Sequence, residues 1–343
     1  MEDNMKKVFV SAQNGAYDIL IGKGLLSGDC LKQYTDYAIV TDDKVYPIYH
    51  QHFPDAKWIV LPEGETAKSM SNLEMIYGKL MEYGIDRKGA LAALGGGVVG
   101  DITGFAAATF KRGVAFVQFP TTLLAQVDSS VGGKVAVNLP AGKNMVGAFY
   151  QPDVVLADTG TLETLDQRQF AAGMAEVIKY AYIFDHDLHQ RLKRGDMPIE
   201  EIIARCCEIK ADYVARDPYD TGARMQLNYG HTIGHAIETV AGYGTFLHGE
   251  AVAIGMEVAA QLGEVLGISP SGLAEDTRQL LEQYGLPFCV DNKLLMEALG
   301  ILLADKKAEG RKIAFILIDR IGHAVIKSLE VEVIQKKIKE LYL

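Results

Sequence analysis

One stretch limits the possible folds more than any other: the apolar run Ala90–Leu94, which continues directly into Gly95-Gly-Gly-Val-Val-Gly100-Asp101. The run contains only alanine and leucine, so neither face of a strand formed by it suits water. Such a strand is typical of a parallel sheet covered by helices on both faces. Because a helical pattern follows the glycines, the stretch predicts a strand, a glycine loop and a helix in succession.

The flanking sequence repeats this alternation. Asn14-Gly15 lies between two short predicted strands and indicates a β-hairpin. Residues 69–83 carry Leu73, Ile76 and Leu80 at helical spacing. The predicted strands cover residues 8–10, 16–21, 37–40, 58–61, 90–94, 114–117 and 153–157. We therefore expect an α/β fold, with a Rossmann-like, mainly parallel sheet and helices on both faces.

The pattern changes after about residue 160. Helical spacing dominates from about residue 165 to 283, and residues 313–318 form the only convincing late strand. The chain has 343 residues, enough for two substantial cores. The sequence therefore predicts an α/β domain over residues 1–160 and a mostly α-helical domain over residues 161–343.

Composition excludes several classes of function. The formal net charge of −10 argues against a nucleic-acid binder or a protein that binds anionic membranes. The four cysteines form no C-x-x-C pair, which favours a reducing compartment. The N-terminus lacks a signal-peptide pattern, and no uncharged apolar run approaches the roughly 18 residues of a membrane helix. We expect a soluble cytoplasmic protein.

Gly95, Gly97 and Gly100 form a G-x-G-x-x-G pattern between the predicted strand and helix. Such glycines let a phosphate approach the backbone, and N–H groups at the helix N-terminus attract it, so the pattern indicates a dinucleotide. It departs from the Rossmann pattern because the strand ending near Gln118 offers no carboxylate for the ribose. Carboxylates at earlier strand ends could replace it: Asp42, Glu63 and Glu65.

A second glycine-rich segment, Asp128–Lys134, is followed by Gly142-Lys143-Asn144. It is not a P-loop, because Asp128 stands where that motif needs a glycine and Val135 follows the lysine. Two lysines beside glycine turns suit a phosphate or a carboxylate, although solvated surface lysines are the simpler alternative. The neighbouring Asp128 and Asn144 favour a binding site.

Histidines gather in one segment of the predicted helical domain. His231 and His235 are four residues apart and share a helix face, and Glu238, His248 and Glu250 follow closely. Imidazoles and carboxylates gathered in this way are typical of a zinc site. The alternative, that the histidines are surface or core residues of a helix, is weaker for three histidines than for one.

Glu176 is the best candidate for a further ligand. It lies in an apolar helical run, where a carboxylate is costly unless it is paired or binds a metal. Lys179, one turn later, could instead be its ion-pair partner. Cations and an amide surround the histidines in sequence: Lys210, Arg224, Asn228, Lys306 and Lys307.

Several long blocks resemble the 3-dehydroquinate synthase family, in the same order across essentially the whole chain. They are Gly95–Asp101, Pro120–Lys134, Gly142–Asn144, Ala172–Tyr180, Asn228–His235 and Leu247–Glu250. The resemblance implies an N-terminal NAD-binding domain, a helical domain that binds zinc or cobalt, and an active site in the cleft between them. It also implies a homodimer in which Arg112 reaches the site of the neighbouring subunit.

The resemblance further implies roles for individual residues. The metal ligands would be Glu176, His231 and His248, with His235 on the substrate side. Contacts to NAD would come from Asp42, Glu63, Gly64, Glu65, Lys68, Gly95, Gly96, Gly97, Val98, Val99, Gly100, Asp101, Thr121, Thr122, Lys134, Lys143, Thr161, Leu162 and Thr164. The substrate pocket would be lined by Asp128, Lys134, Lys143, Asn144, Lys179, Lys210, Arg224, Asn228, His235 and Lys306.

The implied reaction starts from the sugar phosphate 3-deoxy-D-arabino-heptulosonate 7-phosphate. Transient oxidation by NAD, β-elimination of phosphate, re-reduction and an intramolecular aldol step would give 3-dehydroquinate. Three alternatives remain: another sugar-phosphate cyclase acting on sedoheptulose 7-phosphate or glucose 6-phosphate, a metal-dependent polyol dehydrogenase of the glycerol dehydrogenase type, and a non-catalytic NAD-binding scaffold. Sedoheptulose 7-phosphate and glucose 6-phosphate both lack a carboxylate, so Lys210 and Arg224 would have no carboxylate to bind.

Overall fold

The computed structural model describes residues 5–217, 222–242, 244–304 and 312–342. The chain divides into two compact units, one made of Met1–Leu165 and Ile199–Tyr219, the other of Asp166–Pro198 and Asp220–Leu343. The chain first passes from one unit to the other after Leu165, near the expected boundary at residue 160. Residues 199–219, which the sequence placed in the second domain, belong to the first unit. No helix in the described ranges is long and apolar enough to cross a membrane.

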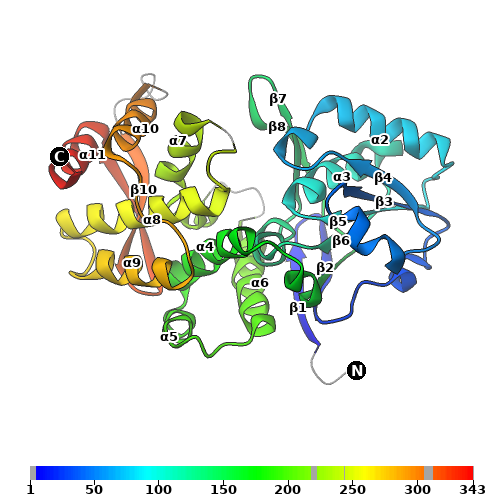
Figure 1. Cartoon of the computed structure of the whole chain (residues 1–343), viewed down its shortest axis with the longest axis horizontal. Coiled ribbons are helices and arrows are strands. Elements are labelled where there is room, and N and C mark those ends of the chain that lie inside the picture. Colours follow the sequence, from blue (N-terminus) through cyan, green and yellow to red (C-terminus); the bar gives the residue numbers. More distant parts are fainter. Residues whose placement is uncertain (1–4, 218–221, 243, 305–311, 343) are drawn as a thin grey trace. The chain divides into compact units, whose positions relative to one another are not determined.

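The first unit is built on a seven-stranded sheet (Figure 1). In spatial order its strands are β1 (Lys6–Ala12), β2 (Gly15–Gly22), β9 (Val154–Asp158), β6 (Ala115–Pro120), β5 (Ala90–Gly95), β3 (Tyr37–Asp42) and β4 (Lys57–Leu61). β1 and β2 are antiparallel, and every other neighbouring pair is parallel. The predicted α/β sheet is confirmed, and each predicted strand before residue 160 coincides with one of these.

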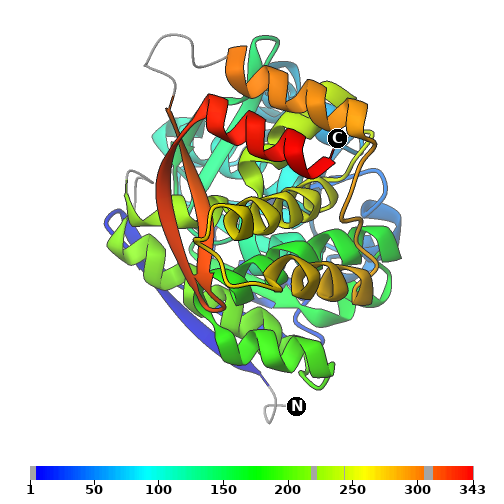
Figure 2. The ribbon, with the colours of Figure 1, turned by 90° about the vertical axis from the view of Figure 1, so that its left-hand side faces the viewer.

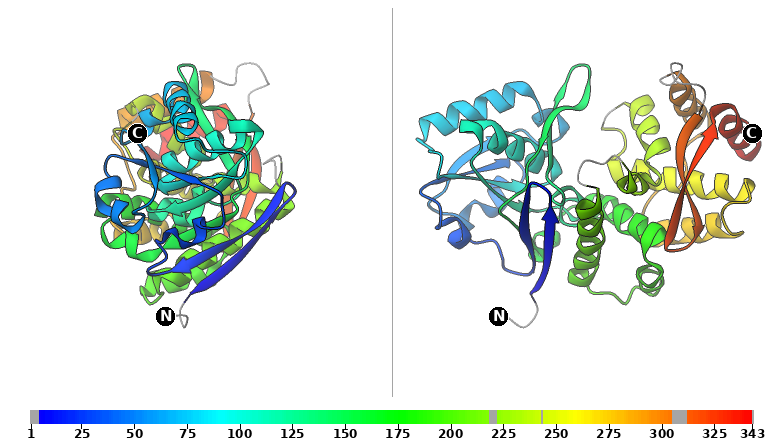
Figure 3. Two further views of the ribbon diagram at one scale, coloured as in Figure 1. Left: turned by 90° about the vertical axis from the view of Figure 1, so that its right-hand side faces the viewer. Right: turned by 180° about the vertical axis from the view of Figure 1, so that it is seen from behind.

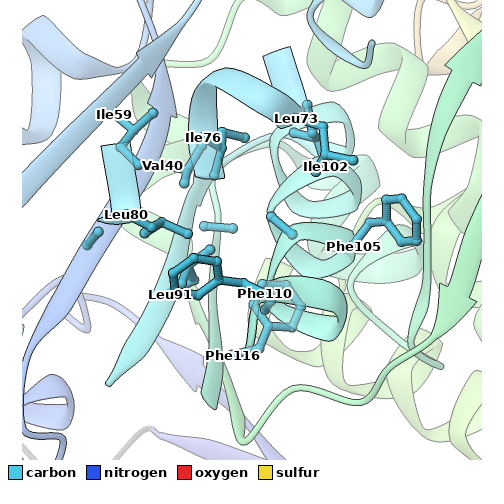
Figure 4. Packing of buried hydrophobic residues seen from close by; sticks show 14 of the residues in the cluster. Val40, Ile59, Leu73, Ile76, Leu80, Leu91, Ile102, Phe105, Phe110 and Phe116 are labelled. Carbon is cyan, nitrogen blue, oxygen red and sulfur yellow. The ribbon is translucent and has the colours of Figure 1, made fainter. Parts of the chain in front are cut away.

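Both faces of the sheet are buried, as the apolar run in β5 predicts. Leu91 and Ala93 contribute to one core together with α2 and α3, whereas Ala92 and Leu94 point into a second core on the opposite face. Figure 4 shows the first core, filled from α2, α3 and the sheet. The helices of this unit are α1 (Tyr46–Tyr49), α2 (Met70–Glu82), α3 (Gly97–Thr109) and α6 (Ile199–Arg216).

Helix α6 packs against β1 and β2, which lie beside it in the right-hand view of Figure 3. Cys206 and Cys207 are both fully buried on this helix, as expected for a small apolar pair. The thiol of Cys207 lies 3.2 Å from the carbonyl oxygen of Gln126, and burial raises the pKa of that thiol to about 12. The cysteine therefore acts as a packing residue and not as a nucleophile.

A separate hairpin of β7 (Lys134–Leu139) and β8 (Gly142–Phe149) was not predicted as strands. The sequence suggested only glycine turns that carry lysines. Val135 and Val137 alternate with more exposed residues and point into the core shared with α3. A Cβ on Gly104 of α3 would lie 2.4 Å from Val135 Cγ1, so this glycine allows α3 to approach the hairpin closely.

The second unit is mostly helical, as predicted. Its helices are α4 (Gln167–Phe184), α5 (His186–Arg194), α7 (His231–Ala241), α8 (His248–Val265), α9 (Leu273–Gln283), α10 (Asn292–Ala304) and α11 (Val331–Tyr342). The late strand is confirmed as β10 (Lys312–Arg320), but it pairs with a second strand that the sequence analysis missed, β11 (His323–Glu330). Figure 2 shows this hairpin beside α11. β11 was missed because half of its side chains are exposed, and the exposed ones mix an apolar residue with polar and charged residues: Ile326, Lys327, Ser328 and Glu330.

Candidate metal centre and cofactor-binding segments

Three helices of the second unit bring Glu176, His231 and His248 together. Glu176 lies in the middle of α4, His231 is the first residue of α7, and His248 is the first residue of α8. Glu176 Oε1 lies 3.5 Å from His231 Nε2 and 3.6 Å from His248 Nε2. Ligands of a tetrahedral zinc ion lie about 3.3–3.5 Å apart when the bonds measure about 2.0–2.1 Å. Glu176 Oε1 therefore lies about as far from each histidine nitrogen as two ligands of one small metal ion lie from each other.

Glycines in the sequence blocks make this convergence possible. A Cβ on Gly249 would lie 1.9 Å from the carbonyl oxygen of Ala172, so the start of α8 rests directly on α4. A Cβ on Gly255 would lie 1.9 Å from the carbonyl oxygen of Gly230, so α8 also rests on the start of α7. Gly230 itself has φ 79°, a left-handed conformation that favours glycine. Side chains at these positions would separate the helices that carry the histidines.

The second ring nitrogen, Nδ1, of each histidine also lies close to an oxygen atom. His231 Nδ1 lies 3.1 Å from the carbonyl oxygen of Tyr229, and His248 Nδ1 lies 3.5 Å from Glu238 Oε2. Metal-binding histidines usually donate their other ring N–H to a carbonyl or a carboxylate, which fixes the tautomer and turns the free nitrogen toward the metal. Both rings therefore present Nε2 to Glu176.

The start of α8 is anchored by Glu250 and Arg168. Arg168 donates from Nε and Nη2 to the two carboxylate oxygens of Glu250, at 2.6 and 2.7 Å. Glu250 Oε2 also accepts the backbone N–H of Leu247 at 2.8 Å. Glu250, which the sequence placed among the possible ligands, thus fixes the turn that carries His248.

Electrostatics keep Glu176 ionised although it is only 1% exposed. Burial alone would raise the pKa of its carboxyl, but the neighbouring positive charge, above all that of Lys179, outweighs burial and holds the pKa well below its usual value. Burial lowers the pKa of His231 to about 3, so this ring is neutral and can offer a lone pair. Lys179 pairs with Glu176 Oε2, whereas Oε1 accepts no hydrogen bond within the described residues.

His235 lies beside this cluster and is exposed. Its ring centroid is 5.4 Å from that of His231 and 5.7 Å from that of His248. One nitrogen from each of the three histidines lies within 4.8 Å of the others, a looser set than the contacts made by Glu176. The geometry therefore favours Glu176 over His235 as the third ligand.

Two further residues predicted for this unit, Arg224 and Asn228, come shortly before His231 in the sequence. Arg224 is 3% exposed and Asn228 is the last residue of the short 3-10 helix η7 (Ala223–Asn228), which precedes α7. Lys306 and Lys307 lie outside the described residues.

In the first unit, the glycine pattern forms the predicted loop between a strand and a helix. β5 ends at Gly95, and α3 begins at Gly97. A Cβ on Gly97 would lie 2.8 Å from Ser129 Oγ, and one on Gly96 would lie 3.2 Å from Thr122 Cγ2. Thr121 donates its backbone N–H to the carbonyl oxygen of Gly95 at 3.0 Å. The loop 95–101 and the segment 121–122 therefore lie side by side at a helix N-terminus suited to phosphate.

The turn after β4 is joined to this helix. Lys68, 4% exposed, forms an ion pair with Asp101 of α3. Burial raises the pKa of Asp101, and Lys68 opposes that rise. Nearby, Lys44 pairs with Glu63 at 3.1 Å, and the Asp42 carboxylate accepts the N–H of Val45 at 2.8 Å. The turns after β3 and β4 thus lie at the same edge of the sheet as the glycine loop.

A third segment, residues 161–164, meets the same edge through Gln126, which the sequence analysis missed. Gln126 is fully buried, and its Nε2 donates to the carbonyl oxygens of Pro120 and Asp158 at 3.0 Å and to Thr161 Oγ1 at 3.1 Å. Thr164 Oγ1 contacts the Tyr49 hydroxyl, and Leu162 lies between the two threonines. A single buried amide has no sequence pattern that would have identified it.

The predicted substrate residues of this unit form two groups. Asp128 lies in a π-helical turn, η5 (Ala125–Ser129), and Lys210 of α6 reaches its carboxylate at 2.9 Å and its carbonyl oxygen at 2.7 Å. Single π-turns are frequent at functional sites. Lys134, Lys143 and Asn144 lie on the β7–β8 hairpin, Asn144 with φ 57°.

Arg112 stands apart from these groups. It ends the turn η4 (Phe110–Arg112), beyond the C-terminus of α3, whereas the glycine loop lies at the N-terminus of that helix. Within the first unit, the structure therefore does not bring Arg112 to the other predicted site residues.

Comparisons with known proteins agree with these features. A family profile described as 3-dehydroquinate synthase N-terminal matches residues 58–172, and one described as 3-dehydroquinate synthase C-terminal matches residues 173–308. The chain is 46% identical to the 3-dehydroquinate synthase of Acidithiobacillus ferrooxidans over 94% of each chain, and 45% identical to that of Pelobacter propionicus over 96% of this chain and 97% of the other.

Solved structures share the fold. The crystal structure of a 2-deoxy-scyllo-inosose synthase complexed with carbaglucose-6-phosphate, NAD+ and Co2+ superposes with a TM-score of 0.85 at 28% identity, covering 98% of this chain and 100% of the other. The matching profiles cover most of the chain, and the relatives match it over almost their full length. The chain belongs to the 3-dehydroquinate synthase family.

Proposed function

We propose that the chain converts 3-deoxy-D-arabino-heptulosonate 7-phosphate into 3-dehydroquinate and phosphate, the carbon–oxygen lyase step of the shikimate pathway. Relatives that carry the name of this activity share 45–46% of their residues with the chain. The observation that carries the proposal is the convergence of Glu176 Oε1 with His231 Nε2 and His248 Nε2 in a chain of this family. The 2-deoxy-scyllo-inosose synthase, at 28% identity, supports the cofactor classes and not a different substrate.

We propose Glu176, His231 and His248 as the ligands of a zinc or cobalt ion. The site fits such an ion because a buried carboxylate oxygen without a hydrogen bond faces two oriented imidazoles. When both groups are bound, the metal would polarise a substrate hydroxyl, and NAD would accept a hydride and later return it. His235, exposed beside the ligands, would contact the substrate.

The chain's own cations and amides would bind and orient the substrate. The substrate carries a carboxylate at one end and a phosphate at the other, and the protein has a net charge of −10, so both ends need local positive charge. We assign this role to Lys134, Lys143, Lys179, Lys210, Arg224 and Lys306, with Asp128, Asn144 and Asn228 positioning hydroxyl groups. Asp128 and Lys210 already hold one another in a defined geometry.

NAD would bind at the edge of the sheet where the parallel strands end. Backbone N–H groups of the glycine loop 95–101 would hold the pyrophosphate at the start of α3. Asp42 and the 63–68 turn would contact the ribose, and the threonines of residues 121–122 and 161–164 would complete the site.

We also propose that the chain forms a homodimer, in which Arg112 contributes to the site of the partner subunit. Sedimentation of the purified chain tests it, and a monomer would contradict it.

One assay tests the reaction. The purified protein with zinc and a trace of NAD+ should release phosphate from the heptulosonate phosphate without net accumulation of NADH. Stoichiometric NADH from glycerol or another polyol would instead indicate a dehydrogenase. Phosphate release from glucose 6-phosphate or sedoheptulose 7-phosphate, but not from the heptulosonate, would indicate another cyclase. Binding of NAD+ with no turnover of any of these compounds would indicate a non-catalytic scaffold.

A further inference from the structure

Asn138 joins two groups of residues that the proposed function treats separately. It lies on β7, in the hairpin that carries Lys143 and Asn144. The regular register of the hairpin is interrupted between Val137 and Leu139, which leaves Asn138 out of the ladder. Bulges of this kind redirect a residue away from its own strand pair and are frequent beside active sites.

The backbone N–H of Asn138 is bound to the turn after β4. Its N–H donates to the carbonyl oxygen of Lys68 at 2.8 Å, and Ser69 and Asn138 form an isolated parallel bridge. Lys68 in turn pairs with Asp101 of α3. The bulge thus connects the hairpin to a turn and a helix that we assign to the cofactor.

The side chain of Asn138 makes two further hydrogen bonds in opposite senses. Its Nδ2 donates to Glu65 Oε1 at 2.7 Å, and its Oδ1 accepts the backbone N–H of Asn144 at 2.8 Å. The partners fix the orientation of the amide, because a carboxylate can only accept and an N–H can only donate. Asn144 has φ 57°, a left-handed conformation that asparagine adopts more readily than most residues, and the bond from its N–H to Asn138 Oδ1 holds this backbone in place.

We propose that Asn138 is a positioning residue that couples the cofactor turn 63–68 to the substrate-binding tip of the hairpin. Movement of Glu65 on cofactor binding is passed through the amide of Asn138 to the backbone of Asn144 and hence to the neighbouring Lys143. Asparagine suits this task because it offers one donor and one acceptor at a short, fixed separation. The proposal rests on the proposed function for the identities of the two ligands, but not for the link itself.

The first test measures the link without any ligand. In the Asn138→Ala variant, the backbone amide of Asn144 should exchange with deuterium about tenfold faster than in the unsubstituted protein, because its acceptor is lost. Asn14→Ala is the matched control. Asn14 is also an amide that holds this hairpin, but at its base, with Nδ2 donating to the carbonyl oxygen of Phe149 at 2.8 Å. Unchanged exchange at Asn144 in Asn138→Ala would overturn the proposal.

The second test measures coupling to the cofactor. Binding of NAD+, followed by calorimetry, should weaken about tenfold in Asn138→Ala and stay unchanged in Asn14→Ala. With the heptulosonate phosphate, Asn138→Ala should raise KM and lower kcat, whereas a purely structural defect would reduce only the fraction of folded enzyme. Unchanged NAD+ affinity together with unchanged KM would contradict the coupling.

A pair of substitutions separates the two sides of Asn138. Asn138→Asp keeps an acceptor for the N–H of Asn144 but places a carboxylate against Glu65, so NAD+ binding should fall further than in Asn138→Ala while exchange at Asn144 stays slow. In a protein that already carries Glu65→Gln, Asn138→Asp should reduce NAD+ affinity several-fold less than it does in the unsubstituted protein, because glutamine can donate a hydrogen bond to aspartate. Equal losses in the two backgrounds would overturn the proposal.

The experiments distinguish an error in the role of Asn138 from an error in the proposed reaction. If the unsubstituted protein binds NAD+ but does not release phosphate from the heptulosonate, the assigned reaction is wrong, while the exchange and NAD+ measurements still decide the role of Asn138. If the unsubstituted protein is active and Asn138→Ala matches it in exchange, NAD+ affinity and KM, only the role of Asn138 is wrong.

Discussion

At the scale of single residues, the proposed metal ligands are Glu176, His231 and His248. We expect Glu176→Ala, His231→Ala and His248→Ala each to weaken zinc binding by more than about a hundredfold, because even loss of a residue behind a ligand costs about ten- to a hundredfold. His235→Ala should keep zinc and lose turnover. Competition with a chromogenic chelator measures the affinity, and elemental analysis measures the bound zinc.

His235→Ala is also the control for this prediction. The His235 ring lies beside the rings of His231 and His248, but we do not propose it as a ligand. Loss of zinc in His235→Ala together with retention in Glu176→Ala would move the site to the three histidines and contradict our assignment.

The residue scale also shows where the sequence stops being informative. The spacing of His231 and His235 predicts a shared helix face and suggested a pair of ligands, but the structure turns Nε2 of His231 toward Glu176, on a helix far away in the sequence. The partners of Nδ1, Tyr229 and Glu238, follow from helix packing that no local pattern reveals. Gln126, in the turn η5, and Asn138, on β7, were missed because a single amide has no sequence pattern that reveals its partners.

At the scale of helices, the approach of α8 to α4 depends on Gly249. In Gly249→Ala the added methyl group would lie 1.9 Å from the carbonyl oxygen of Ala172, a backbone atom that cannot move aside cheaply. We expect a loss of about 3 kcal/mol in the free energy of unfolding. Zinc affinity should also fall, because His248 is displaced from Glu176. Urea titration and zinc competition measure the two effects.

Gly300→Ala provides the matched control in the same unit. Gly300 lies within α10, and apart from its chain neighbours and the backbone of the helix itself, no atom of the described residues lies within 4 Å of an added Cβ. Alanine is the better helix former, so this variant should gain about 0.5–1 kcal/mol and keep its zinc affinity. If Gly249→Ala behaves like Gly300→Ala, close helix contact does not build the site.

The predicted elements differ in how well a local pattern describes them. The inner strands of the seven-stranded sheet were predicted because burial on both faces makes them apolar runs, as in β5, whereas β1 and β2 were predicted from the Asn14-Gly15 turn between them. β7 and β8 escaped notice because glycines and lysines at their ends resemble loops, and in β8 no residue is fully buried. Half-exposed hairpins are stabilised by what they pack on, which a single sequence does not specify.

At the scale of the whole molecule, the sequence indicated the change from an α/β to a helical composition but not the path of the chain. α6 follows two helices of the second unit, yet its buried face packs on β1 and β2 of the first. An amphipathic pattern states which face of a helix is buried but not which surface covers that face. The return of the chain to the first unit also brings Lys210 to Asp128, a contact between residues 82 positions apart.

Acid stability is the property of the whole molecule that the structure predicts most directly. Asp276 of α9 accepts hydrogen bonds from Tyr182 of α4 and His189 of α5, both at 2.7 Å, and pairs with Lys193. Burial alone would raise the pKa of the Asp276 carboxyl, but His189, Lys193 and Tyr182 outweigh burial and hold the pKa well below 3.8. A depressed folded-state pKa contributes stability above the unfolded value and loses that contribution as the pH falls through the folded value.

We therefore expect Asp276→Asn to lower the free energy of unfolding by about 2 kcal/mol at pH 7. The free energies of unfolding of the variant and the unsubstituted protein should differ by the same amount at pH 5 as at pH 7. This difference should become smaller below about pH 4, where the aspartate of the unfolded chain takes up its proton. Urea midpoints across this range provide the measurement. Glu275→Gln is the control, because the neighbouring Glu275 side chain is 59% exposed and its contact with Arg278 is long, at 3.5 Å. If the difference for Asp276→Asn persists unchanged down to pH 3, the carboxylate does not stabilise the junction of α4, α5 and α9 through its charge.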